Sequence, residues 1–331
     1  MKGAPSDPRE RDRLILALNE IWHDLENRAY DAKHPDILEA EIPRWERVLG
    51  QALAGPRGPA VVLDLGSGTG FVPMRLKGFL AEDDRLICSD LSSGMLSVCR
   101  TAVAAGGCRF TLETLKLDGR IIDLPDASLD LVTANAVMHH LPRPEEVCRE
   151  IDRILKPGGL VLIGHEPTRA YGESRFLAAS YWLLSPLADF KQFIYEIILR
   201  LGWFEALRGP LGRFLPELEA HNRLLADVNA RLRELGLIEK PLAADTISSL
   251  LDAQSPNAGG PQAGRGFAFS DFEGYFPGYR PEFRETYTHL GKIHPRAPWM
   301  RGYARWLARR FPESGGNLFC GLRKGNTAGG P

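Results

Sequence analysis

The sequence predicts an α/β protein built on a doubly wound, mostly parallel β-sheet, and three observations lead to this fold class. Short apolar runs alternate with helical patterns between residues 60 and 165. The first apolar run is followed by a glycine-rich turn that opens a helix, and Lys-Pro-Gly-Gly at 156–159 separates a helix from the next apolar run. Apolar strands that alternate with helices are typical of a parallel sheet covered on both faces.

The individual elements follow from local patterns. A helical region at 10–54 places Leu14, Leu18 and Trp22 on one face before prolines and glycines end it. Strands are expected at residues 60–65, 85–89, 109–114, 129–133 and 160–164, and again near 283–290 and at 317–322. Helices are expected near 71–80, 92–105, 144–155, 270–276 and 300–310.

The composition is that of a globular protein with balanced charge. Lys and Arg number 41 and Asp and Glu 42 among 331 residues, for a net charge of −1. This balance argues against a strong sequence-independent nucleic-acid binder, so no nucleic-acid partner is expected. The five cysteines show no C-x-x-C spacing, as in proteins of a reducing compartment. Without a signal-like segment or an apolar run of about 18 residues, we expect a cytoplasmic protein with no transmembrane helix.

The chain divides into four segments. These are an N-terminal helical segment at 1–59, a core at 60–169, a helical insertion at 170–266, and a remainder at 267–331 with a second helical insertion between its last two strands. The insertion at 170–266 begins with the most aromatic stretch of the chain, and we expect it to cap an apolar or aromatic ligand. Alternatively, the aromatic stretch belongs to the ordinary hydrophobic core, to a homodimer interface or to a surface that contacts a membrane. The last is the weakest, because Lys and Arg do not cluster there.

Residues 61–70 read Val-Val-Leu-Asp-Leu-Gly-Ser-Gly-Thr-Gly and are the most informative part of the chain. An apolar strand is closed by Asp64, and three glycines then form a loop that has no side chains to hold a ligand away. A dinucleotide fingerprint would need glycine at position 71, which is Phe71, and the Gly-Lys-Ser/Thr of a phosphate-binding P-loop is absent. The spacing therefore argues against both of these loops, while the bare backbone still suits a nucleotide-like ligand.

The Asp-x-Gly-x-Gly-x-Gly pattern resembles motif I of the class I S-adenosylmethionine (SAM) methyltransferases. Further stations of that family follow in order: Asp90 at the end of the next apolar strand, Leu117-Asp118-Gly119, Asn135 after the fourth strand, and the turn at 156–159. The resemblance covers residues 60–165 well and the last two strands weakly. It points to the branch with a type 11 domain that contains quinone, sterol and small-metabolite methyltransferases. It implies a Rossmann-like seven-stranded sheet of order 3-2-1-4-5-7-6, with SAM as the cofactor.

The resemblance also implies roles for individual residues. The glycine loop would pack along the methionine tail, Asp90 would accept hydrogen bonds from both ribose hydroxyls, and Asp118 would accept one from the adenine amine. A helix N-cap at Asp90 and a solvated loop acid at Asp118 are the simpler interpretations. The cofactor-binding residues implied in this way are Asp64, Gly66, Ser67, Gly68, Gly70, Asp90, Leu91, Met95, Asp118, Gly119 and Asn135.

Methyl transfer from SAM is an in-line displacement, so catalysis consists largely of positioning and exclusion of water. A general base is needed only where the nucleophile starts protonated. Three histidines near the carboxyl ends of the fourth and fifth strands are candidates for orienting the substrate or removing a proton: His139, His140 and His165. Residues that could contact substrate are Tyr30, Glu166 and Tyr171. The histidine pair is common in this branch and is often structural or in contact with SAM. No metal is expected, because no element carries tightly spaced ligands.

The expected activity is transfer of the SAM methyl group to a small apolar or aromatic metabolite, which yields S-adenosylhomocysteine. A lipophilic-quinone or lipid methyltransferase at a membrane surface is one alternative. A catalytically silent SAM-binding partner subunit is another. A dehydrogenase that uses NAD is disfavoured by Phe71. The stretch after the fourth strand reads Thr-Ala-Asn-Ala, not Asn/Asp-Pro-Pro-Tyr/Phe, which argues against methylation of adenine or glutamine amide nitrogens.

Overall fold

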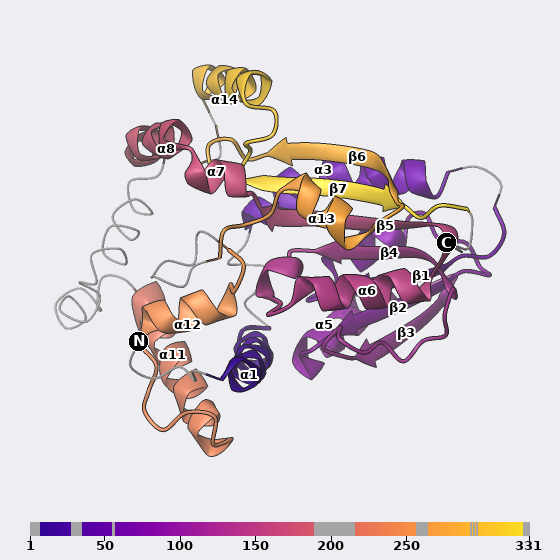
Figure 1. The fold of residues 1–331 in the computed structure, drawn as a ribbon, viewed down its shortest axis with the longest axis horizontal. Coiled ribbons are helices and arrows are strands. Elements are labelled where there is room, and N and C mark those ends of the chain that lie inside the picture. The colour runs from indigo at the N-terminus through magenta and orange to yellow at the C-terminus, as the bar shows by residue number, and fades with distance from the viewer. Residues whose placement is uncertain are drawn as a thin grey trace.

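The fold is a seven-stranded sheet whose strand order, β3-β2-β1-β4-β5-β7-β6, confirms the predicted order. The computed structural model describes residues 7–27, 35–54, 57–188, 216–255, 264–291, 293, 295 and 297–326. The strands are β1 (Val61–Leu65), β2 (Arg85–Asp90), β3 (Thr111–Lys116), β4 (Leu129–Asn135), β5 (Leu155–Pro167), β6 (Arg280–Tyr287) and β7 (Asn317–Arg323). The first five pair in parallel, and β7 runs antiparallel to both of its neighbours (Figure 1).

Parallel pairing brings the carboxyl ends of β1, β2, β4 and β5 to one edge of the sheet. Leu65 is in register with Ser89 on one side and Ala134 on the other, and Asn135 is in register with Gly164. Loops that follow these strands therefore leave the sheet side by side. This is the edge at which open α/β sheets bind ligands.

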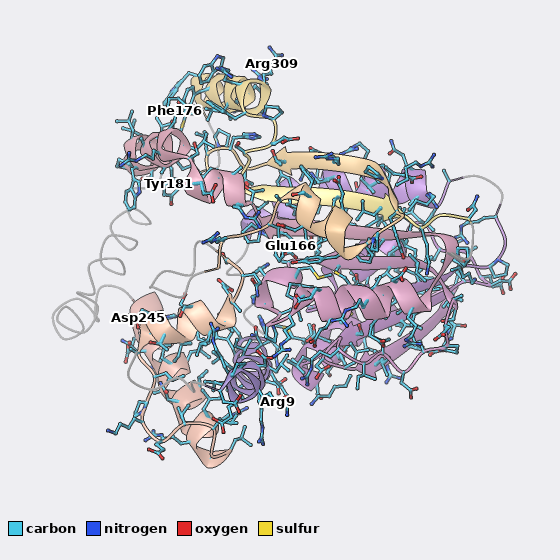
Figure 2. All side chains as sticks on the ribbon, viewed as in Figure 1. Arg9, Glu166, Phe176, Tyr181, Asp245 and Arg309 are labelled. Carbon is cyan, nitrogen blue, oxygen red and sulfur yellow. The ribbon has the colours of Figure 1, made fainter. Side chains whose placement is uncertain are left out.

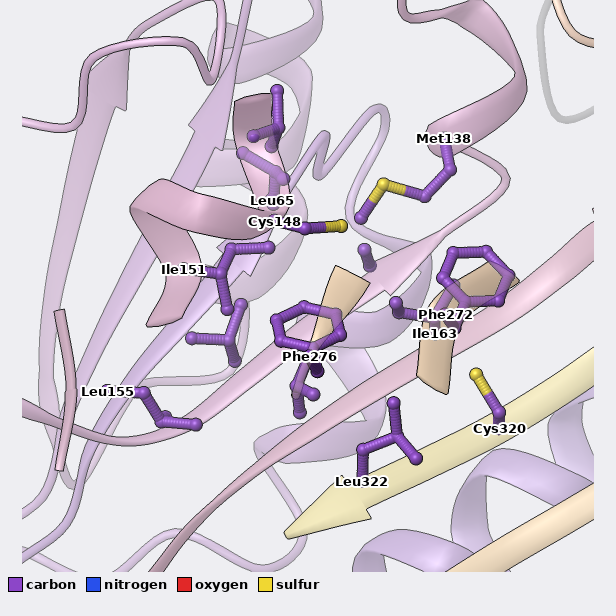
Figure 3. Close-up of a cluster of buried hydrophobic side chains, with 14 of the residues drawn as sticks. Leu65, Met138, Cys148, Ile151, Leu155, Ile163, Phe272, Phe276, Cys320 and Leu322 are labelled. Atoms are coloured by element: carbon purple, nitrogen blue, oxygen red, sulfur yellow. The ribbon is translucent and has the colours of Figure 1, made fainter. Parts of the chain in front are cut away.

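Helices cover both faces of the sheet, as the alternating pattern predicts. One face carries α3 (Pro35–Ala52), α4 (Phe71–Leu76) and α5 (Ser93–Ala104), with Trp45 and Val48 of α3 fully buried. The other face carries α6 (Pro144–Ile154) and α13 (Phe269–Tyr275). Figure 3 shows Cys148 and Ile151 of α6 packed with Phe272 and the strand residues of this second core. Four of the five cysteines are buried and all five are free thiols.

The remaining helices form two separate groups outside the sheet. The helices α1 (Pro8–Glu26), α11 (Pro216–Glu234) and α12 (Ala244–Leu251) share one apolar cluster. The helices α8 (Arg175–Ala188) and α14 (Pro298–Arg310) share another, beside the short α7 (Arg169–Glu173). In Figure 1 the two groups lie apart, with α8 and α14 at the top and α1, α11 and α12 at the lower left. The described parts of segment 170–266 thus pack in two places, and the proposed boundaries of the four segments stay a prediction.

Several element boundaries differ from the sequence-based expectation. The described residues of the N-terminal helical region include two separate helices, α1 and α3. The sixth strand ends at Tyr287 because Thr288 adopts a left-handed backbone with φ of 55°. The fifth strand begins at Leu155 because the turn at 156–159 is itself held against the end of β7: Gly158 N–H donates to Lys324 O at 3.2 Å and Lys324 N–H donates to Gly159 O at 2.9 Å. No helix in the described ranges is long and apolar enough to span a bilayer.

Candidate active site

The glycine loop between β1 and α4 holds a backbone shape that glycine alone adopts easily. Gly66, Gly68 and Gly70 have φ of 63°, 53° and 103°, all in the left-handed region. A Cβ atom on Gly66 would lie 2.5 Å from Val137 Cγ2, whereas one on Gly68 would meet no atom within 4 Å. The loop therefore packs against the chain that follows β4 at Gly66 and presents bare backbone to open space at Gly68.

Ser67 fastens this loop to the neighbouring strand β2. Its N–H donates to Ser89 O at 2.7 Å, and its hydroxyl donates to Asp64 O at 3.0 Å. In return Ser89 N–H donates to Ser67 Oγ at 3.1 Å, and the Ser89 hydroxyl donates to Asp64 O at 2.9 Å. These reciprocal bonds fix the loop relative to the carboxyl ends of β1 and β2.

Asp90, the last residue of β2, is oriented by main-chain donors on both sides. Its Oδ2 accepts from Gly68 N–H at 2.9 Å and its Oδ1 accepts from Ser92 N–H at 2.8 Å. Burial raises the pKa of Asp90, and the two N–H donors partly offset this. Each oxygen keeps acceptor capacity for a ligand. The N-cap of α5 is Ser92, whose side chain accepts from Met95 N–H, so Asp90 is not that cap.

Asp64 is almost completely buried beneath the loop. Its carboxylate accepts a hydrogen bond from Thr133 Oγ1 of β4 at 2.5 Å, which holds β1 and β4 together below the cleft. Burial raises the pKa of Asp64 to about 7, although the Thr133 hydroxyl acts in the opposite direction. Near neutral pH the group is therefore poised between its neutral and charged forms.

A cleft of about 1030 Å³, including its open mouth, lies over the glycine loop. Ten of the eleven residues expected to bind the cofactor line it, and Gly70 does not. The ten are Asp64, Gly66, Ser67, Gly68, Asp90, Leu91, Met95, Asp118, Gly119 and Asn135. Asp118 also accepts from its neighbour Arg120, whose Nη2 lies 2.6 Å from Oδ2.

Helix α1 supplies a wall of this cleft through residues that the sequence analysis did not single out. Leu16, Asn19 and His23 line the cleft from α1. The helix is anchored by Asp24, whose Oδ1 accepts from Ser92 Oγ and from Gly94 N–H at the start of α5. Only residues of the apolar face of α1 were identified from the sequence, because these polar contacts depend on how the helix docks.

Of the three candidate histidines, only His140 lines the cleft. Its Nδ1 lies 2.9 Å from Leu251 O, so this nitrogen carries the proton and Nε2 is left as the acceptor. Burial, and next the charge of His139, lower the pKa of His140 to about 4. His140 is therefore neutral at physiological pH.

Glu166 is a buried anchor for the histidine pair and lies outside the cleft lining. Its Oε1 accepts from the N–H groups of Val137 and Met138, and its Oε2 accepts from His139 N–H and lies 2.8 Å from His139 Nδ1. Burial lowers the pKa of His139, but the adjacent Glu166 carboxylate outweighs burial and the net shift is upward. The carboxylate has no exposed surface, which argues against the predicted contact with substrate.

His165 lies at the same edge of the sheet but in a second polar cluster. Its Nδ1 is 3.1 Å from Glu41 Oε1, and its N–H donates to the Tyr287 hydroxyl at 2.9 Å. Glu41 is fully buried, and its Oε2 has no hydrogen-bond partner among the described residues. Asn135 connects this cluster to the cleft, because its Oδ1 accepts from Trp45 Nε1 of α3 at 2.9 Å. Glu41 escaped the sequence analysis because it lies 124 residues before His165.

Of the two remaining candidates for substrate contact, only Tyr171 is described, and it does not line the cleft. Tyr171, in α7, packs against the α8–α14 cluster. Tyr30 lies outside the described residues. The only candidate metal-ligand group in the described ranges comprises His139, His140 and Asp252. Both Nδ1 atoms of this histidine pair already have acceptors, in Glu166 and in Leu251 O.

Comparison with known proteins agrees with this geometry. A family model described as a methyltransferase domain matches residues 63–163, which run from β1 into β5. Residues 63–163 thus form a SAM-dependent methyltransferase domain of the class I type. The ubiquinone/menaquinone biosynthesis C-methyltransferase UbiE of Xylella fastidiosa is 29% identical over 195 residues, which are 58% of this chain and 70% of that protein. The UbiE protein of Vibrio campbellii is 22% identical over 228 residues, which are 68% and 82% of the two chains.

Among solved structures, a SAM-dependent methyltransferase from Aquifex aeolicus is 27% identical, with a TM-score of 0.34 over 40% of this chain and 66% of that one.

SAM is the cofactor of the methyltransferase domain, and the residues of the cleft fit it. A Cβ on Gly68 would project into open space where a ligand can approach the backbone. The two oriented oxygens of Asp90 suit a cis-diol.

Asp90→Asn tests the cofactor site. The amide keeps the shape but loses the charge and turns one acceptor into a donor toward a main-chain N–H. Hydrogen bonds to a charged group contribute about 1.5–3 kcal/mol, so affinity for S-adenosylhomocysteine should fall roughly ten- to hundredfold by titration calorimetry. The exposed Asp126→Asn variant is the matched control and should bind as the wild type does. Equal affinity in Asp90→Asn would contradict the assignment.

Asp64→Asn tests the buried carboxyl through pH. The folded-state pKa of about 7 lies above the ordinary value of 3.8, so between these values the folded protein holds a proton that the unfolded chain releases. Stability from this group is therefore lost as pH rises from about 4 to about 7. An asparagine does not titrate, so the variant does not lose this stability. As pH rises across this window, the free energy of unfolding of Asp64→Asn should therefore increase relative to that of the wild type by about 1–4 kcal/mol. Denaturant titrations at several pH values measure this, and parallel curves would rule out the raised pKa.

Proposed function

We propose that this methyltransferase transfers the SAM methyl group to a ring carbon of a small aromatic acceptor of the quinol class. The UbiE relatives, named as ubiquinone/menaquinone biosynthesis C-methyltransferases, support this acceptor class. The cleft supports it too, because aliphatic side chains from α1, β1 and the segment after β4 line it: Leu16, Leu65, Val137 and Leu141. The observation that carries the proposal is the SAM cleft with a neutral histidine in its wall.

In this proposal the protein positions the reactants, excludes water from the cleft and accepts a proton. When bound, SAM supplies the electrophilic methyl group. The glycine loop receives the methionine tail, Asp90 fixes the ribose, and Leu91 and Met95 pack on the adenine. Helix α1 excludes water from the open side of the cleft.

His140 is the proposed acceptor of the proton that the ring loses on methylation. Its Nδ1–H is held by Leu251 O, so the Nε2 lone pair is the free one. His139, fastened to Glu166, holds the 3₁₀ turn η1 (Met138–His140) in place. His165, with its partners Glu41 and Tyr287, does not line the cleft and has no step in this proposal. A homodimer and a cytoplasmic location stay predictions.

His140→Ala tests the mechanism. The purified enzyme should convert SAM and a reduced, demethylated short-chain quinol to S-adenosylhomocysteine and a product heavier by one CH₂, both measured by mass spectrometry. Loss of a general base lowers kcat by about 10²–10⁴, so the variant should bind S-adenosylhomocysteine normally but turn over that much more slowly. His221→Ala, on α11, is the matched control. Cofactor binding without turnover of any quinol would favour the alternative of a catalytically silent partner subunit. Full activity of His140→Ala would show that His140 is not the general base.

A further inference from the structure

Large apolar side chains gather on the outer surface of just two helices. Eight large hydrophobic residues are exposed in the described part of the chain, and five of them come from α8 and α14. These five are Phe176 (47% exposed), Leu183 (73%), Leu187 (70%), Trp299 (57%) and Trp306 (49%). Concentrated exposure of this kind marks an interaction site more often than scattered single residues do.

The exposed residues of the two helices meet at Phe176 and Trp306. Phe176, Leu183 and Leu187 are spaced seven and four residues apart, which places them along one face of α8. The Phe176 and Trp306 rings lie 6.4 Å apart across the two helices, and Trp306 stacks on Tyr303 at 5.7 Å. Buried Leu177, Met300 and Leu307 join the helices beneath this surface, so it has its own rigid support.

Basic side chains lie along the same helix as the two tryptophans. Helix α14 carries four exposed arginines and no acidic residue, in a chain whose net charge is −1. The four are Arg301, Arg305, Arg309 and Arg310. Figure 2 shows Phe176 of α8 and Arg309 of α14 together at the end of the molecule that projects away from the sheet. The proximity of these two features could not be predicted from the sequence, because the aromatic stretch of α8 and the arginines of α14 belong to two different insertions.

We propose that the outer surface of α8 and α14 binds an anionic phospholipid bilayer. Tryptophan side chains favour the boundary between headgroups and acyl chains, exposed leucines can enter it, and arginines can reach the phosphates from alongside. Each basic residue near an anionic surface contributes about 1 kcal/mol. A second copy of the chain fits less well, because a two-fold contact through α14 would bring arginines toward arginines.

This surface goes beyond the proposed function and does not depend on the identity of the acceptor. It gives the enzyme a way to work beside a lipid phase. The test therefore measures binding to vesicles alone, without SAM or quinol, and its result is separate from that of the turnover assay.

Co-sedimentation with vesicles tests the proposal. The wild type should bind vesicles of phosphatidylcholine containing about one-third phosphatidylglycerol, bind pure phosphatidylcholine much more weakly, and release as salt rises. Arg305→Glu with Arg309→Glu should weaken binding at least about tenfold. Leu183→Ser with Trp299→Ser should weaken it while leaving these charges intact. All variants should keep wild-type affinity for S-adenosylhomocysteine, which shows that they fold.

The matched controls are Ile121→Ser for an exposed apolar residue (79% exposed) and Arg280→Glu for an exposed arginine, both away from α8 and α14. They should bind vesicles as the wild type does. The proposal is overturned if the wild type ignores anionic vesicles, if it binds neutral vesicles equally well, or if the α8 and α14 variants bind like the controls. It is also overturned if those variants convert a dimer to a monomer by light scattering, because the surface would then serve a second copy.

Discussion

The hydrogen bond from Gly68 N–H to the Asp90 carboxylate, 2.9 Å long, is the contact on which the rest of the site depends. It joins the turn after β1 to the end of β2. That turn exists because three glycines accept left-handed backbone, and Ser67 ties the turn to Ser89. The same contact orients the Asp90 carboxylate toward the cleft, where each of its oxygens can accept a further hydrogen bond. The proposed recognition of the cofactor thus depends on the junction between two parallel strands.

The described helical additions form two groups with different partners. Helices α1, α11 and α12 pack together, and α1 closes the cleft through Asp24 at the start of α5. Helices α8 and α14 form a separate pair that exposes apolar and basic side chains. A methyltransferase domain needs little more than the sheet and the loop for its cofactor, so these additions are where acceptor choice and location are expected to be decided.

Sequence patterns predicted the sheet and the cofactor loop because both follow from short-range signals. The apolar run before Asp64 and the glycine spacing after it specify a strand and a turn within ten residues, and Asp90 closes the next strand in the same way. Strand order followed from the resemblance to a family. Local signals did not show that the 170–266 insertion packs in two places, because each helix there is amphipathic whichever partner it meets.

Long-range polar contacts were the hardest to predict. Glu166 was expected near substrate, but its carboxylate oxygens are hydrogen-bonded to three main-chain N–H groups and to the His139 ring. His165 was grouped with the histidine pair, yet its partner is Glu41 from α3. Both outcomes depend on which side of β5 each residue faces, and the left-handed backbone of His165, with φ of 57°, changes that alternation.

The most direct test of the central claim is a crystal structure of the enzyme with S-adenosylhomocysteine. The account predicts both ribose hydroxyls within hydrogen-bonding distance of the two Asp90 oxygens, and the homocysteine tail along the backbone at Gly66 and Gly68. A nucleoside bound with its sugar away from Asp90, or a ligand outside the cleft between α1 and the glycine loop, would contradict it.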